Sequence, residues 1–97
     1  MKIRAKNGEQ TVDITLPATD MDIQYCMKCI GIEDIVPVCC ISEVRDEPSY
    51  FGFLKGQTVN MDELNFFARR LDGMTEYEKR VVGVYSSETG MREMKQL

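Results

Sequence analysis

The stretch that decides the fold runs from Asn60 to Gly73 and reads NMDELNFFARRLDG. Its apolar side chains recur at helical spacing and form a single stripe: Met61, Leu64, Phe67, Ala68 and Leu71. Asn60 can accept a hydrogen bond from the backbone N–H of Glu63, and Glu63 can reach back toward Asn60, which is the geometry of a capping box. Gly73 suits the left-handed conformation that commonly closes a helix. The stretch therefore predicts an amphipathic helix with one buried face.

A second helix start follows at Thr75, with Glu76 and Glu78 in the first turn, where the helix dipole favours negative charge. Apolar side chains then repeat at helical spacing: Tyr77, Val81, Val84 and Tyr85. The link from Asp72 to Thr75 is short, so the two helices are expected to fold back as an antiparallel pair. Three valines and Gly83 lower the helix propensity, and the second helix should therefore depend on packing against the first.

Two strands joined by a tight turn are predicted at the start of the chain. Residues 1–6 alternate between apolar and basic side chains, and residues 10–16 alternate between apolar and polar ones. Asn7 and Gly8 tolerate positive φ, which makes this pair a strong hairpin signal. Pro17 cannot donate a backbone hydrogen bond to a sheet, so it ends the second strand.

A helix and a third strand complete the first half of the chain. Thr19 opens the helix and Gly31 closes it, and its apolar side chains share one face: Ile23, Cys26, Met27 and Ile30. Residues 35–43 are rich in β-forming side chains and predict the third strand, with Pro37 at its start or on a sheet edge. The aromatic segment Tyr50–Gln57 is either a short strand or an irregular arm packed on the sheet.

Together these elements predict an α+β fold. A small, three-stranded, mainly antiparallel sheet with one helix, in the order ββαβ, is followed by a helical hairpin. Residues 1–57 are expected to form the ββαβ domain with its aromatic arm, and residues 58–97 the hairpin and a C-terminal tail. Within that tail, residues 91–97 predict either a short helix or a frayed end.

The charge is unevenly distributed along the chain. The net charge is −4, but residues 9–47 alone contain nine acidic and two basic residues, while residues 48–97 contain seven of each. The acidic block is typical either of an ordinary solvated face or of a surface that meets a basic partner. Direct binding to nucleic acid is disfavoured, because phosphates attract clustered lysine and arginine.

Membrane insertion and secretion are not expected from this sequence. No apolar run approaches the roughly 20 residues that a membrane helix needs. Lys2 and Arg4 are followed by polar residues rather than by the apolar core of a signal peptide. The cytoplasm is the expected compartment.

Four cysteines raise the question of a thiolate metal site, since Cys26, Cys29, Cys39 and Cys40 are in principle four ligands. Cys26 and Cys29 fall on the predicted helix, and Cys26 belongs to its apolar stripe. Cys39 and Cys40 are neighbours in the predicted strand, so they point to opposite faces. Buried structural thiols, with Cys26 against the sheet, are therefore expected rather than a metal site or a disulfide.

Catalytic chemistry has little support in the residues. The sequence contains no histidine, the commonest general base. The acidic pairs Glu33-Asp34 and Asp46-Glu47 fall in predicted loops, where solvated charges are the ordinary interpretation. No phosphate loop, nucleophile elbow or dinucleotide fingerprint is present. We therefore expect a protein that is not an enzyme and has no cofactor.

Several stretches resemble the ArdA-type antirestriction proteins of conjugative plasmids and transposons. They are TVDITLPAT at residues 11–19, IGIED at residues 30–34 and MDELNFFARRL at residues 61–71, followed by the second helix with Glu76 and Glu78. The resemblance extends over roughly residues 1–87. Members of that family are not enzymes. The resemblance implies an acidic protein that imitates the phosphates of double-stranded DNA, occupies the DNA groove of type I restriction–modification enzymes, and so protects a mobile element.

A mimic of this kind needs carboxylates on rigid elements that face basic residues of its target. The expected partner-binding acids are those of the acidic block: Glu9, Asp13, Glu33, Asp34, Glu43, Asp46 and Glu47. Asp20 and Asp22 belong to the same block, with helix capping as a competing reason for their presence. The partner would be a protein, and a homodimer stays open.

The alternative is a non-enzymatic interaction or regulatory module of a mobile element. Exposed parts of Phe66, Tyr77 or Tyr85 on the helical hairpin would then bind another protein. A contiguous exposed apolar patch would support this alternative, and full burial of the aromatic rings would weaken it.

Overall fold

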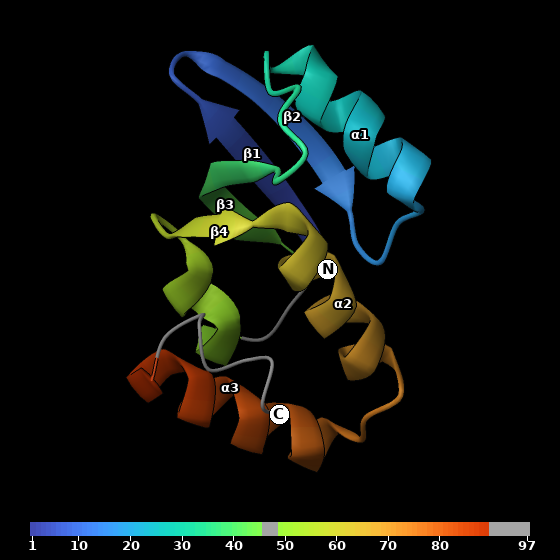
Figure 1. The fold of residues 1–97 in the computed structure, drawn as a ribbon. Helices are drawn as coiled ribbons and strands as arrows, with labels where there is room; N and C mark the ends of the chain where they lie inside the picture. Colours follow the sequence, from blue (N-terminus) through green and yellow to red (C-terminus); the bar gives the residue numbers. More distant parts are fainter. Residues whose placement is uncertain (46–48, 90–97) are drawn as a thin grey trace.

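The computed structural model describes residues 1–45 and 49–89 and shows an α+β fold. In this part of the chain a four-stranded antiparallel sheet, in the order β2-β1-β3-β4, is combined with three α-helices and one 3₁₀ helix, η1 (Figure 1). The elements are β1 (Lys2–Asn7), β2 (Gln10–Thr15), α1 (Asp20–Cys29), β3 (Val38–Arg45), η1 (Ser49–Leu54), β4 (Thr58–Asn60), α2 (Met61–Asp72) and α3 (Glu76–Thr89). The predicted tail at residues 91–97 lies outside the described residues, as do Asp46 and Glu47.

The hairpin between β1 and β2 is antiparallel, as predicted, but its corner is displaced by one residue. Asn7 pairs with Gln10, so Gly8 and Glu9 form the two-residue turn, and Gly8 has a φ of 65°. Asn7 stays in the strand. Its side-chain amide donates a hydrogen bond of 2.8 Å to the carbonyl of Ile30 at the end of α1. The hairpin is thereby fixed to the helix that covers it.

The sheet has one strand more than the sequence predicted. β4 pairs with β3 through Cys39 and Val59, and the side chain of Val59 is buried. A strand of three residues is too short to show an alternating pattern, and here it runs directly into α2. The predicted third strand is also displaced: it starts at Val38, not at Ile35, because Pro37 has no N–H for the ladder.

α1 has the predicted start and end. Thr19 Oγ1 accepts the N–H of Asp22 at 3.1 Å. Gly31 has a φ of 80°, its N–H donates to the carbonyl of Lys28, and the N–H of Ile32 donates to that of Met27. This pair of bonds is a Schellman motif, and it turns the chain sharply away from the helix.

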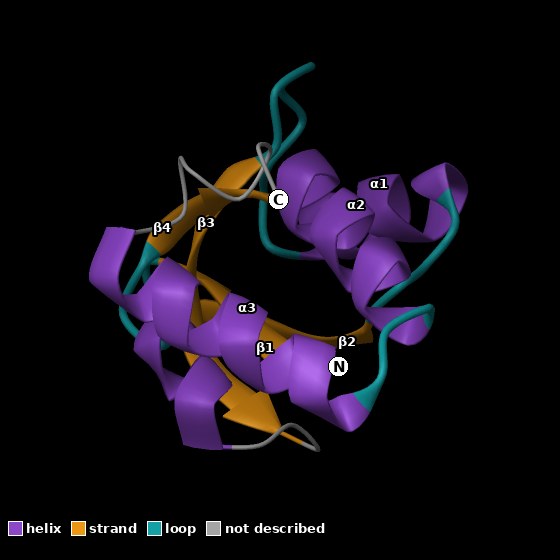
Figure 2. Cartoon of the chain, turned by 90° about the horizontal axis from the view of Figure 1, so that it is seen from below, coloured by secondary structure: helices purple, strands orange, loops and turns teal. Residues whose placement is uncertain are grey.

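The predicted aromatic arm is the 3₁₀ helix η1. Phe51 from this helix is fully buried, and its ring lies edge-on to Phe67 of α2, with 6.0 Å between the ring centroids. α3 packs mainly against η1 and not, as predicted, as the antiparallel partner of α2 (Figure 2). The main packing partner of α3 is therefore the aromatic arm, whereas the sequence predicted α2.

The buried face of α3 also differs from the prediction. The expected stripe is exposed, at 75% for Tyr77 and 50% for Val81. Instead Val82 packs against the core and Gly83 is buried. Because Val81 and Val82 are adjacent, two neighbouring faces of the helix carry apolar side chains. The face with Val82 and Gly83 is the one that packs inward, against η1. The start of α3 is as predicted and includes a complete capping box, with Thr75 and Glu78 bonded reciprocally at 3.1 and 3.2 Å.

Candidate functional site

Two of the predicted partner-binding acids lie on the outer face of the sheet and are ion-paired there. Arg4 of β1 stands opposite Asp13 of β2 and Glu43 of β3. Its guanidinium lies 2.8 Å from an Asp13 carboxylate oxygen and 3.2 Å from one of Glu43. Arg45 adds a second contact of 2.7 Å to Glu43. We call this row of four charged side chains the sheet network.

The sheet network shifts the ionisation of its own members. The hydrogen bond from Arg4 lowers the pKa of Asp13, and the hydrogen bond from Arg45 lowers the pKa of Glu43. The bond to Asp13 also raises the pKa of Arg4. Each carboxylate therefore already has a cation beside it, and a basic partner would have to compete with that cation.

The other predicted acids are placed differently. Glu9 is exposed at the corner of the hairpin, and Glu33 and Asp34 are exposed in the segment between α1 and β3. The structure brings Glu33 and Asp34 together with Asp20 of α1 and Asp62 of α2 around one groove. It does not bring Asp13 or Glu43 to this groove.

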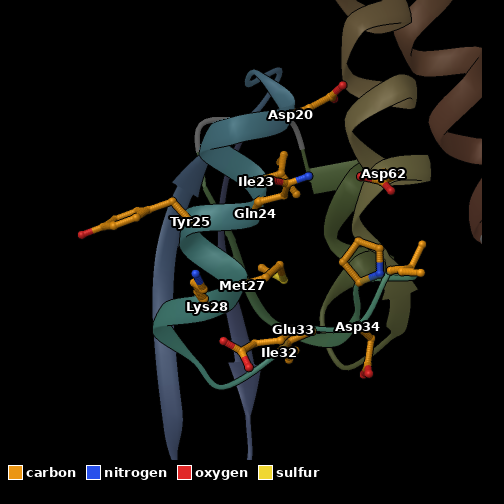
Figure 3. A pocket seen from close by; sticks show the side chains of 12 residues that line it. Asp20, Ile23, Gln24, Tyr25, Met27, Lys28, Ile32, Glu33, Asp34 and Asp62 are labelled. Atoms are coloured by element: carbon orange, nitrogen blue, oxygen red, sulfur yellow. The ribbon is translucent and has the colours of Figure 1, made fainter.

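The groove has a volume of about 780 Å³ and lies between α1, residues 32–37 and the start of α2 (Figure 3). We call its four acidic side chains the groove carboxylates: Asp20, Glu33, Asp34 and Asp62. Within the described residues none of them forms an ion pair, and Lys28 is the single basic residue of the lining. Figure 3 shows Asp20 and Met27 projecting from α1 toward α2, whereas Tyr25 points away.

Two helix N-termini position half of the groove carboxylates. Thr19 caps α1, which makes Asp20 its first residue. Asn60 caps α2, and its Oδ1 accepts the N–H of Asp62 at 2.9 Å and that of Glu63 at 3.3 Å. The dipoles of both helices favour negative charge at these ends. Asp62 was not among the predicted partner-binding acids. The signal that could have pointed to it is that both acidic helix starts border the same loop.

A buried amide holds the two walls of the groove at a fixed distance. Asn65 of α2 is only 3% exposed, and its Oδ1 accepts the N–H of Ala18 at 2.8 Å while its Nδ2 donates to the Ala18 carbonyl at 2.9 Å. Arg69 donates a further bond of 3.0 Å to the same carbonyl. Ala18 lies two residues before α1, so this contact attaches the start of α1 to the side of α2. Asn65 was not predicted to have this role, although it is a polar residue next to the apolar stripe of the helix.

Apolar side chains form the floor of the groove. Ile23 and Met27 from α1 and Ile32 from the following loop are buried and belong to the core. At the border of the groove Ile35 is 99% exposed, and the neighbouring Val36 is 56% exposed. An acidic rim thus surrounds an apolar floor with uncovered apolar side chains beside it.

All four cysteines are free thiols in distinct environments. Cys39 is buried, which raises the pKa of its thiol to about 11, with a smaller effect from Cys40. Cys26 is partly buried, and burial raises the pKa of its thiol as well. Cys29 is exposed and Cys40 is partly buried. The prediction of buried thiols is therefore confirmed for Cys39 alone, is wrong for Cys29, and holds only in part for Cys26 and Cys40. In the described ranges no three His, Cys, Asp or Glu side chains are grouped to hold a metal ion.

No helix in the described part of the chain combines the length and the apolar character needed to cross a membrane. No protein-family model, curated protein or solved structure matches this chain.

Proposed function

We propose that this chain is a non-enzymatic inhibitor that binds the DNA-binding site of a type I restriction–modification enzyme as an acidic mimic of DNA. One observation carries the proposal: the groove carboxylates, gathered from three segments of the chain, form no ion pair within the described residues. A DNA-binding site is lined with lysine and arginine, which unpaired carboxylates on rigid elements can meet. The resemblance of the sequence to antirestriction proteins supports the same function.

The proposal assigns different weights to the acids of the first half of the chain. Asp13 and Glu43 are neutralised by Arg4 and Arg45, so they are expected to contribute little to binding. Glu33 and Asp34, together with Asp20 and Asp62, are expected to contribute most. Each exposed pair adds roughly 0–1 kcal/mol, so affinity should be distributed over several contacts.

A competition experiment tests this function. A type I methyltransferase is bound to a labelled DNA duplex, and the protein is added at two ionic strengths. Displacement of DNA at micromolar protein, weaker at the higher salt concentration, is the expected result. Absence of displacement at low salt would remove the proposal.

Matched variants locate the surface in the same assay. Glu33→Gln with Asp34→Asn removes two unpaired charges, while Asp13→Asn with Glu43→Gln removes two paired ones. The double variant at Glu33 and Asp34 should displace DNA less well than the parent protein. The double variant in the sheet network should displace DNA almost as well as the parent. Equal effects of the two pairs would mean that only total charge matters.

A second candidate function, a protein-interaction module, is favoured by the uncovered stripe of α3. Tyr77 and Val81 are at least half exposed, and Phe66 of α2 is 53% exposed. A module of this kind would use apolar contact and would be insensitive to salt. Sedimentation of the parent and of the Val81→Asp variant tests whether a second copy covers this stripe, and identical monomer behaviour of the two would exclude self-association through α3.

A further inference from the structure

We propose that the groove between α1 and α2 binds an amphipathic basic segment of a partner protein, with an apolar side chain of that segment over the groove floor and its lysine or arginine side chains against the groove carboxylates. The inference rests on the proposed function in using the same acids. It adds that the partner is recognised by shape and apolar contact as well as by charge.

The groove offers apolar contacts at its floor and at its border. A groove of about 780 Å³ is in the size range of peptide and ligand sites. Its floor is formed by Ile23, Met27 and Ile32, and Ile35 is almost fully exposed at its border. An apolar side chain placed here would cover Ile35 and remove apolar surface from water on both partners.

The negative charge of the groove selects the kind of segment that can bind there. Four carboxylates and one lysine line the groove, so an acidic segment or nucleic acid would meet like charge. A second copy of this chain carries a net charge of −4 and would bring its own carboxylates to the contact. A segment with lysine or arginine on both sides of an apolar anchor complements both the rim and the floor.

The walls of the groove are held in place before any partner arrives. Asn65 bonds both backbone groups of Ala18, and the Schellman motif at Gly31 fixes the loop that carries Glu33 and Asp34. The N–H of Met61 also donates to the carbonyl of Pro37 at 2.8 Å, which joins α2 to the end of that loop. A preformed groove loses little conformational entropy on binding, and laying an amphipathic helix into such a groove is a common mode of peptide recognition.

Three synthetic peptides test the inference. The first is a fluorescein-labelled helical peptide of lysine, alanine and leucine, with the leucines on one face. The second has serine in place of leucine at equal charge, and the third has glutamine in place of lysine. We expect the first peptide to bind at least fivefold more tightly than either of the others, and its amide chemical-shift changes to gather at Gln24, Lys28 and residues 32–36. Equal affinity of the serine peptide, or shift changes confined to α3, would overturn the proposal.

Protein variants separate the groove from the sheet network. Ile35→Ser should reduce binding of the leucine peptide while leaving the weak binding of the serine peptide unchanged, and because Ile35 is 99% exposed this change does not touch the core. Asp13→Asn with Glu43→Gln removes two negative charges outside the groove, so it is the control for a change of net charge and should leave peptide binding within twofold. An unchanged affinity of Ile35→Ser for the leucine peptide would contradict an apolar anchor at this site.

The peptide assay and the DNA competition assay test two separate claims, and each claim can be refuted without the other. Peptide binding in the groove without displacement of DNA would remove the restriction-enzyme proposal and leave the groove as a docking site for another basic protein segment. Displacement of DNA without any preference for leucine over serine would keep mimicry and remove the apolar anchor.

Discussion

Both acids of the sheet network and three of the four groove carboxylates come from the acidic block at residues 9–47, yet the two groups are in opposite electrostatic situations. On the sheet, Arg4 stands in register with Asp13 and Glu43 and pairs with both. Around the groove, helix starts and a loop bring carboxylates together, and the described part of the lining contains no arginine. The comparison teaches that the number of acids in a stretch does not determine its binding capacity. What matters is whether strand pairing places a cation opposite each of them.

The largest expected effect is on the structural support of the groove. Asn65→Ala removes two hydrogen bonds and leaves backbone groups of Ala18 without these partners, so the free energy of unfolding should fall by about 2 kcal/mol. Urea unfolding measures this loss. The control on the sheet side is Ser42→Ala, which removes one bond of 3.2 Å to the Arg4 carbonyl and should cost about 1 kcal/mol or less. A smaller loss for Asn65→Ala than for Ser42→Ala would show that this amide does not hold the groove.

A somewhat smaller effect is expected at the loop that carries Glu33 and Asp34. Gly31→Ala forces an alanine into a φ of 80° and places its Cβ 3.3 Å from Gln10 Oε1, which should cost about 1–2 kcal/mol. Gly52→Ala is the matched control, because its Cβ would meet nothing within 4 Å and the position has no positive φ. Thermal unfolding of the two variants separates conformational strain from a general effect of the added methyl group, and equal melting temperatures would contradict the strain.

The binding difference between the two acidic surfaces should be smaller still. Removing the charges of Glu33 and Asp34 is expected to weaken inhibition by about fivefold, equivalent to about 1 kcal/mol, from the usual weight of exposed charge pairs. Titration of the variant against the methyltransferase–DNA complex at low salt gives this number. At high salt the parent and the variant should inhibit equally well, because salt screens the charge interactions of Glu33 and Asp34. A difference that persists at high salt would point to a change other than charge.

The smallest expected effect is the pH dependence of the sheet network. Because the pKa values of Asp13 and Glu43 are lowered in the folded state, the unfolded chain binds more protons in acid. The stability that the network contributes is therefore fully present above the ordinary carboxyl pKa values of about 4, and it is lost as the pH falls through the lowered values. Urea midpoints measured between pH 6 and pH 2 should fall less for Asp13→Asn with Glu43→Gln than for the parent. Parallel curves would show that the ion pairs add nothing to folding.

The sequence was sufficient to predict those elements that have local signals. The caps at Thr19, Asn60 and Thr75 lie where hydrogen-bonding side chains precede helical periodicity, and all three are confirmed. The pairing of Arg4 with Asp13 did not follow from these signals, because a turn at Asn7 and Gly8 would place Arg4 opposite Thr11. The observed corner lies one residue later, and this shift brings Asp13 opposite Arg4.

Other features depend on contacts between segments that are distant in sequence, and no local pattern predicts them. Glu43 reaches Arg4 only because a bulge at Ser42 shifts the register of β3 by one residue. The buried face of α3 is decided by packing against η1, whose Phe51 lies far away in sequence. The groove itself requires Asn65 to meet Ala18, a contact between residues 47 positions apart.

β4 runs into α2 without a linker, so the edge strand of the sheet is directly connected to the helix that borders the groove. Asn60 is at once the last residue of the strand and the cap of the helix, so there is no flexible joint between them. We therefore expect a displacement of α2 at Asp62 to move Thr58 and Val59 as well. The residues of β4 lie outside the lining of the groove. We nevertheless expect their backbone amide chemical shifts to change when the groove is occupied.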